Sequence, residues 1–128
     1  MLNKTLIIGN LTKDPELRYT PSGTAVGTLR LACNRKFKAH GTGELKEEVC
    51  YISVVVWGKQ AENCNAHLKK GQGVLIDGRL QSRSWEKDGV KHYTIEICAE
   101  YIQYLDRTKE GTDLDGEEGP DNPFPSEG

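Results

Sequence analysis

Apolar and polar side chains alternate along most of this chain, and that alternation limits the folds open to it. In residues 74–86, Val74, Ile76, Gly78 and Leu80 occupy one set of alternate positions, and mostly charged or polar residues occupy the other. A repeat of two residues places successive side chains on opposite faces of a β-strand, whereas a helix requires a repeat of 3.6. The pattern therefore predicts an all-β chain whose strands each bury one face.

Turn residues divide the alternation into five predicted strands, at residues 6–10, 26–33, 49–57, 74–86 and 91–105. Gly and Asp are common in the two-residue turns of hairpins, as at Asp88-Gly89. A second hairpin loop is predicted at residues 40–43, where two glycines occur. The connection between the first two strands contains Asp14-Pro15 and turn residues at positions 21–23.

One segment, residues 60–70, has the spacing of a helix. Ala61, Cys64 and Leu68 lie at i, i+3 and i+7, and Gly71 occupies the position of a C-terminal cap. Three strands, a short helix and two strands is the element order of an OB-fold. This is a five-stranded Greek-key barrel whose face and loops bind oligonucleotides or oligosaccharides. We therefore predict an all-β OB-fold with one short helix between strands three and four.

The formal net charge of −2 conceals two unlike regions. Residues 1–109 contain all 17 Lys and Arg against 12 acidic residues, a balance of +5. Residues 110–128 contain seven acidic residues and no Lys or Arg, and they have few large apolar side chains. Such a segment buries too little surface to offset the entropy of ordering. We predict a folded basic domain at residues 1–107 and a disordered acidic tail at residues 108–128.

The four cysteines are widely spaced and form no CxxC pair. The N-terminal residues have no secretory pattern, so free thiols in a reducing cytoplasm are expected. Cys64 and His67 are one helical turn apart, but two ligands without a second pair make a weak metal site. We expect no metal and no cofactor, and we interpret the cysteines as small, mostly buried apolar residues.

Aromatic side chains lie among cations at the polar positions of the predicted strands. Tyr51 and Trp57 alternate away from the core positions of one strand, and Trp85 does so on another, beside Arg83. Phe37 lies within a basic run at positions 35–38, in the arm of the predicted hairpin. Rings that stack on bases and cations that neutralise phosphates are typical of single-strand binding. The same rings could instead cover a subunit interface or fill a barrel, because aromatics are enriched at protein interfaces.

Several segments resemble the bacterial single-stranded DNA-binding protein family. They are LIIGNL at 6–11, DPELRYTPSG at 14–23, VVVWGKQAE at 54–62, KKG at 69–71 and GRLQSRSW at 78–85. The resemblance extends over residues 1–105. It implies a non-enzymatic OB-fold that forms a homotetramer and binds single-stranded DNA without sequence specificity. It further implies a role in DNA replication, recombination and repair, in the cytoplasm and associated with the nucleoid.

The resemblance also implies the site residues. Its base-stacking positions fall on Phe37, Tyr51, Trp57 and Trp85, although the family often has Trp at the first two and Phe at the third. Its basic positions fall on Lys4, Arg18, Lys59, Lys70, Arg79 and Arg83. The residue pattern itself adds Arg35, Lys36 and Lys38, because they flank Phe37. The family's acidic tail recruits genome-maintenance proteins, which points to Asp121, Pro123 and Phe124 as partner-binding residues here.

Two other functions remain open on sequence grounds. One is a single-stranded RNA-binding OB-fold of the cold-shock or translation type, although cold-shock domains are shorter and cluster their surface aromatics in a short segment. The other is a small thiol enzyme, but the sequence has neither a phosphate-binding loop nor a GxSxG motif. Glu47 and Glu48 are adjacent, so on a strand they point to opposite faces and form no acid–base pair.

Overall fold

The computed structural model describes residues 1–105. The predicted tail, with Asp121, Pro123 and Phe124, lies outside the described residues. The elements are β1 (Thr5–Leu11), β2 (Glu16–Tyr19), β3 (Ala25–Lys38), β4 (Leu45–Trp57), α1 (Lys59–His67), β5 (Gly73–Lys87) and β6 (Val90–Tyr104). No helix of this part of the chain is long and apolar enough to cross a bilayer.

The strands form one sheet in the order β1-β5-β6-β4-β3-β2, and a further β1–β3 pairing closes it into a barrel. That closure joins Asn10 to Ala32 and Leu11 to Leu31. The β4–β6 pairing is parallel, and the other pairings are antiparallel. The predicted OB-fold is therefore confirmed. The short strand β2 was not predicted, so the helix follows the fourth strand of the chain instead of the third.

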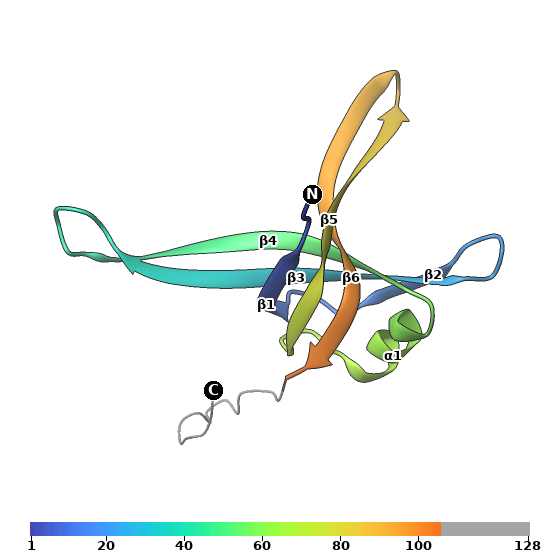
Figure 1. The fold of residues 1–128 in the computed structure, drawn as a ribbon, viewed down its shortest axis with the longest axis horizontal. Coiled ribbons are helices and arrows are strands. Elements are labelled where there is room, and N and C mark those ends of the chain that lie inside the picture. Colours follow the sequence, from blue (N-terminus) through green and yellow to red (C-terminus); the bar gives the residue numbers. More distant parts are fainter. Residues whose placement is uncertain (106–128) are drawn as a thin grey trace.

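Two hairpins extend well beyond the barrel, one formed by β3 and β4 and the other by β5 and β6 (Figure 1). We call them the β3–β4 arm and the β5–β6 arm. The β3–β4 ladder continues as far as the pair Lys38 and Leu45, whereas the sequence predicted strands only at 26–33 and 49–57. Residues 41–50 are all exposed. Alternation reports burial of one face, so it is lost where neither face of a hairpin is buried.

The core is formed by the inward residues of the barrel strands and by α1. Its most buried members are Leu29, Leu31, Val54, Val56, Val74, Ile76, Ile97, Ala61, Cys64 and Leu68. Leu80 was expected among them but is 45% exposed. The β5–β6 ladder has a bulge at Asp77 and Gly78, and Leu80 lies just beyond it toward the arm. A residue with inward parity is buried only where the barrel continues beside it.

The helix is shorter than predicted, because it ends at His67 and not at Lys70. Leu68 has extended backbone angles (φ −105°, ψ 148°), yet its side chain is buried. Leu68 is seven residues after Ala61 and is buried as a helical residue at that spacing would be, but it lies beyond the end of the helix. Gly71 has a φ of 91°, but it lies in the turn after the helix, and its N–H donates to the carbonyl of Leu11. The predicted cap at Gly71 is thus wrong.

Gly78 is required by the close approach of β5 and β6. A Cβ at this position would overlap the backbone carbonyl of Cys98. We expect Gly78→Ala to lower the free energy of unfolding by about 2–3 kcal/mol, because backbone on both sides must move. Ser84→Ala, at an exposed position of the same strand, should change it by less than about 0.5 kcal/mol. Urea unfolding followed by circular dichroism measures both, and equal midpoints would contradict the close-approach argument.

Candidate nucleic-acid interface

Ladder register decides which side chains share a face, because residues directly opposite in neighbouring strands point the same way. In the β3–β4 ladder, Tyr51 lies opposite Ala32 and Ser53 opposite Arg30, on the side away from the core residue Val54. The β4–β6 and β5–β6 ladders continue this side to β5, and the β2–β3 ladder continues it to β2. We call this side the outward face. Its predicted binding residues are Arg18, Lys36, Lys38, Tyr51, Trp57, Arg79, Arg83 and Trp85.

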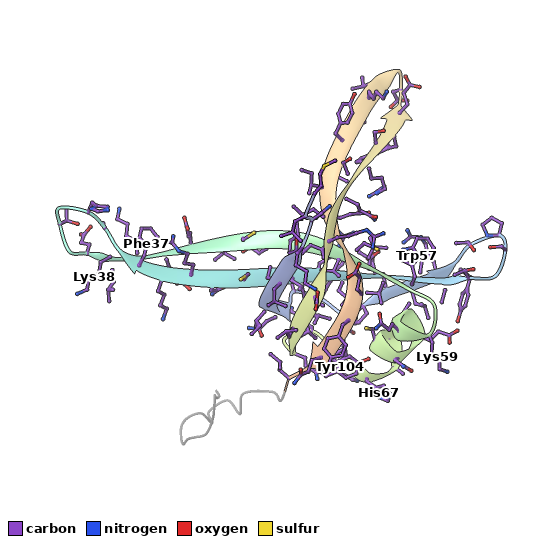
Figure 2. All side chains as sticks on the ribbon, in the orientation of Figure 1. Phe37, Lys38, Trp57, Lys59, His67 and Tyr104 are labelled. Carbon is purple, nitrogen blue, oxygen red and sulfur yellow. The ribbon has the colours of Figure 1, made fainter. Side chains whose placement is uncertain are left out.

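The predicted aromatic residues form an extended row and do not meet in one pocket. Phe37 lies toward the end of the β3–β4 arm, whereas Trp57 lies on the other side of the barrel, near α1 (Figure 2). Tyr51 is six residues before Trp57 on β4, which is roughly 20 Å at the usual rise of a strand. One planar group cannot contact both rings. The arrangement suits an extended ligand that crosses several strands.

Phe37 departs from the outward face. It lies opposite Lys46 and an even number of positions from the core residue Leu31, so its parity is that of the core side. Its ring is half-buried, and the guanidinium carbon of Arg35 lies 4.7 Å from the ring centroid. The basic run at 35–38 is therefore divided between two faces, with only its two lysines on the side of Tyr51.

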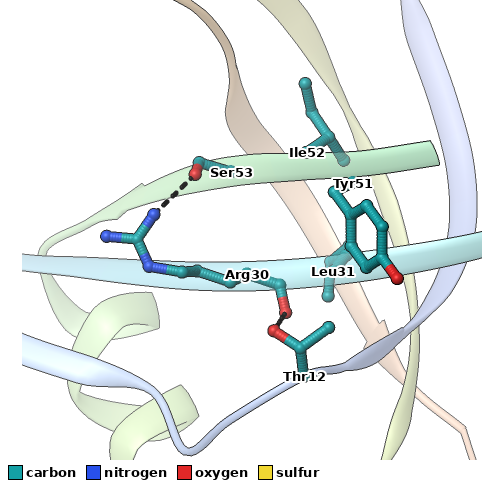
Figure 3. Close-up of a pocket in the computed structure, with 6 residues that line it drawn as sticks. All are labelled: Thr12, Arg30, Leu31, Tyr51, Ile52 and Ser53. Atoms are coloured by element: carbon teal, nitrogen blue, oxygen red, sulfur yellow. Dashed lines mark hydrogen bonds between the residues drawn. The ribbon is translucent and has the colours of Figure 1, made fainter.

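Tyr51 is the most exposed of the four predicted rings, at 72%. It lines an open cavity of about 190 Å³ together with Thr12, Arg30, Leu31, Ile52 and Ser53 (Figure 3). A guanidinium Nη1 of Arg30 donates to Ser53 Oγ at 3.0 Å, and its Nη2 lies 3.7 Å from Glu16. The cavity thus combines a flat apolar ring with a positioned cation.

Arg30 was not among the residues predicted for the site. The signal was present, because Arg30 alternates away from the core positions Leu29 and Leu31. Arg79 and Arg83 have the same outward parity on another strand, and they were included because the family resemblance implies them. What the sequence did not show is that the β3–β4 register places Arg30 beside Ser53, and so beside Tyr51.

The Trp85 ring is less accessible to a stacking base than the Tyr51 ring. Its ring stacks on that of His92, the residue opposite it on β6, with centroids 5.4 Å apart and planes 18° from parallel. The guanidinium carbon of Arg83 lies 4.9 Å from the Trp85 ring centroid. Trp57 is 48% exposed. A base can therefore reach Tyr51 and Trp57 directly, whereas at Trp85 it must share the ring with existing partners.

Several predicted cations are paired with carboxylates. These pairs are Lys4–Asp77 (2.6 Å), Arg35–Glu48 (2.6 Å), Lys59–Glu62 (3.9 Å), Arg79–Glu100 (3.3 Å) and Arg83–Glu96 (3.4 Å). The Asp77 hydrogen bond raises the pKa of the Lys4 ammonium. Within residues 1–105, Arg18, Lys36, Lys38 and Lys70 have no such partner. Three of the predicted lysines lie away from the β3–β4 arm. Lys4 is in the N-terminal segment, Lys59 begins α1, and Lys70 is in the loop after α1.

Arg83 has a structural role, because it pairs with the carboxylate of Glu96. This carboxylate is only 4% exposed, and it accepts hydrogen bonds from Gln81 Nε2 at 3.0 Å and from Arg83 Nε at 3.4 Å. A buried carboxylate is costly unless it is paired and hydrogen-bonded. Arg83 therefore stabilises the β5–β6 ladder, and its charge is partly neutralised before any ligand arrives.

The Cys64 and His67 pair lies at the end of α1. Cys64 is buried and His67 is exposed, and burial raises the pKa of the Cys64 thiol. The hydroxyl of Tyr104 lies 3.9 Å from Cys64 Sγ, and desolvation together with this thiol raises the pKa of Tyr104 to about 12. Among residues 1–105, no group of three or more His, Cys, Asp and Glu side chains gathers as metal ligands.

Two curated relatives resemble this chain closely. Single-stranded DNA-binding protein 3 of Listeria innocua is 50% identical over 112 residues, which cover 87% of this chain and 68% of the relative. Single-stranded DNA-binding protein 2 of Chlorobaculum tepidum is 46% identical over 120 residues, which cover 92% of this chain and 80% of the relative.

Solved structures share the fold. The Plasmodium falciparum SSB in complex with ssDNA matches with a TM-score of 0.76 and 28% identity, over 83% of this chain and 96% of that one. The single-stranded DNA binding protein from Thermus aquaticus matches with a TM-score of 0.72 and 41% identity, over 82% of this chain. This chain spans 50% of the T. aquaticus protein. The model of the single-strand binding protein family matches residues 2–105, and the chain belongs to that family.

Proposed function

We propose that this protein binds single-stranded DNA without sequence specificity, by stacking bases on exposed rings and neutralising phosphates with cations. The observation that carries the proposal is the cavity in which the exposed Tyr51 ring and the Arg30 guanidinium lie together on the outward face. Every base has a flat face and every nucleotide has a phosphate, so this chemistry tolerates any sequence. The relatives' names and the solved complex with ssDNA support it.

The outward face indicates a course for the strand. The strand starts at Lys36 and Lys38 on the β3–β4 arm, which have no carboxylate partner among residues 1–105. It then passes over Tyr51 and Arg30 and reaches Trp57 beside α1. The β5–β6 arm, with Trp85, offers a second branch of the same face. Phe37 remains a proposed contact, but a strand must turn around the edge of the arm to reach it.

We propose that the protein protects and organises single strands during DNA replication, recombination and repair, in the cytoplasm at the nucleoid. The sequence of the tail supports a second task, the recruitment of genome-maintenance proteins through Asp121, Pro123 and Phe124. An acidic peptide with one anchoring aromatic ring suits a partner whose apolar pocket has a basic rim.

The outside of the barrel also supports the proposal of a homotetramer. Leu6 and Ile8 on β1, and Tyr101 on β6, are more than half exposed and lie on the side away from the core. In the described part of the chain, β1 pairs with β3 only at Asn10 and Leu11, so Thr5–Gly9 leave one strand edge open. Exposed apolar surface beside an open edge is typical of a subunit contact.

Sedimentation velocity tests the tetramer. We expect the 128-residue chain to sediment as a tetramer and Ile8→Glu to shift it to smaller species, because a carboxylate cannot be buried in an apolar contact without a partner. Leu45→Glu, at an exposed position on the β3–β4 arm, is the matched control and should remain tetrameric. A monomeric parent protein at micromolar concentration would contradict the proposal.

Tyr51 provides the direct test of base stacking. Tyr51→Ala should weaken binding of an oligothymidine by about 1–3 kcal/mol per stacked base, which is roughly 5- to 150-fold. Tyr51→Phe keeps the ring and should bind within a few-fold of the parent. Fluorescence anisotropy at moderate salt measures the affinities, and circular dichroism checks the fold. Unchanged affinity of the alanine variant would show that this ring does not stack on a base.

Two lysines of the β3–β4 arm test which face carries the strand. Lys38 has outward parity and Lys46 has core-side parity, and neither has an ion-pair partner among residues 1–105. Lys38→Gln should reduce the slope of log K against log salt by about 0.7, the value for one phosphate neutralised on a single strand. Lys46→Gln makes the same charge change and should leave the slope unaltered. The reverse result would place the strand on the face of Phe37.

The acidic tail should compete with DNA for the same cations. A chain ending at residue 109 should bind oligothymidine more tightly than the 128-residue chain at low salt, because seven carboxylates are removed. The difference should shrink as salt shortens the range of charge interactions. A tail of unchanged length with Asn and Gln in place of its acids separates charge from length. Equal low-salt affinities of all three proteins would rule out the competition.

A further inference from the structure

Two cysteines face each other at the base of the β3–β4 arm. Cys33 on β3 lies directly opposite Cys50 on β4, and both thiols are free in this structure. Cys33 is half-buried and Cys50 is exposed, in contrast to the buried Cys64 and Cys98. Their side chains share the core-side face of the ladder, so they differ from the other cysteines in having both a partner and access to solvent.

The neighbours of this pair hold the two strands in register. On the barrel side, the next pair on the same face is Leu31 with Ile52, which belongs to the core or packs against it. On the arm side, the next pair is Arg35 with Glu48, whose ion pair is 2.6 Å long. The ladder runs from Val26 to Lys38 without a bulge. The two thiols therefore remain opposite each other while the arm is folded.

Backbone hydrogen bonds define the geometry of the pair. The N–H of Gly58 donates to the carbonyl of Ala25 at 2.8 Å, and the N–H of Ala39 donates to the carbonyl of Glu44 at 2.8 Å. Hydrogen-bonded pairs alternate along an antiparallel ladder, so every second residue from Ala25 to Ala39 belongs to one, including Cys33. The Cα atoms of such a pair lie about 5.5 Å apart. Disulfides form at Cα separations of roughly 4.4–6.8 Å.

The same geometry makes a bond at this position strained. Opposite Cβ atoms in a ladder are about 4.5–5.5 Å apart and are closer in pairs without hydrogen bonds. A disulfide requires about 3.8 Å. The strands must therefore draw together at Cys33 and Cys50. Strained and exposed disulfides have more oxidising potentials and are reduced readily.

We propose that Cys33 and Cys50 form a reversible intramolecular disulfide that locks the β3–β4 arm when the protein meets a peroxide. The exposed Cys50 thiol loses its proton, and the thiolate sulfur attacks a peroxide oxygen. The O–O bond breaks, a sulfenic acid forms, and with hydrogen peroxide the leaving hydroxide takes up that proton as one water. The Cys33 thiol then attacks the Cys50 sulfur, the S–S bond forms and a second water leaves. Two electrons pass from the thiols to the peroxide. A dithiol reductant reverses the bond by thiol–disulfide exchange.

The bond would connect the base of the arm next to the proposed DNA contacts. Tyr51 follows Cys50 directly, and Lys36 and Lys38 lie on the segment that the bond would enclose. With its strands tied at the base, the arm opens less often, so its backbone amides exchange with solvent more slowly. This consequence does not depend on DNA, and it can be measured on the protein alone.

The test uses the full 128-residue chain and hydrogen peroxide. After oxidation, remaining thiols are alkylated, the protein is digested without reductant and the peptides are identified by mass spectrometry. We expect a cross-linked peptide that joins Cys33 to Cys50 within one chain, has lost two hydrogen atoms and is released by dithiothreitol. Cys33→Ser and Cys50→Ser should each abolish it. The proposal would be overturned if every disulfide found were intermolecular. It would also be overturned if Cys50 carried a sulfenic acid while the Cys33 thiol stayed free.

Hydrogen exchange supplies the second measurement. Amides of residues 34–49 should exchange at least several-fold more slowly in the oxidised parent than in the reduced parent. Cys50→Ser treated with the same peroxide should show no such change. Equal exchange in oxidised and reduced parent would overturn the locking of the arm even if the bond forms. Neither measurement uses DNA, so failure here leaves the proposed binding function standing.

Discussion

The continuous β3–β4 ladder is the constraint on which the rest of this structure depends. Because side chains alternate with a period of two, burying Leu29, Leu31 and Val54 commits every other residue of the two strands to the outside. A slip of one residue in either strand would turn that strand over, burying Arg30 of β3 or Tyr51 of β4 and exposing the core residues of the same strand. Barrel stability and the position of the proposed binding face are thus two results of one register.

Fewer Lys and Arg side chains are free to contact phosphate than the composition of this protein indicates. The domain is basic overall, yet Arg35, Arg79 and Arg83 already contact carboxylates on the neighbouring strands. Glu96 is buried, so its pairing with Arg83 supports the sheet. Among residues 1–105, the lysines of the β3–β4 arm without a carboxylate partner are Lys36 and Lys38 on the outward face and Lys46 on the core-side face. This division lets the domain keep its strands together while offering a few unpaired charges at the surface.

The sequence predicted the barrel and the helix because both depend on one buried face. The predictions from sequence were wrong at positions where the periodic pattern and the actual burial of the side chain disagree. Leu68 is buried but lies after the helix, and Leu80 has inward parity but lies where the barrel ends. The hairpin arm around residues 35–38 was predicted, but its strands were predicted too short, because neither face is buried in the outer part of the β3–β4 arm. Arg30 was overlooked although its parity matched that of the residues chosen elsewhere.

The sequence by itself determined the parity of each strand, and with it the outward position of Tyr51, Trp57 and Trp85. Only the tertiary structure decided which residues stand opposite one another. It put Arg30 beside Ser53 and Cys33 against Cys50. It also continued β3 past residue 33, and the parity of that longer strand places Phe37 on the other side of the arm from Tyr51. Parity is a local property of one strand, since it follows from the backbone alone. Register joins residues distant in sequence, and it is set only when loops, core packing and ladder hydrogen bonds are satisfied together.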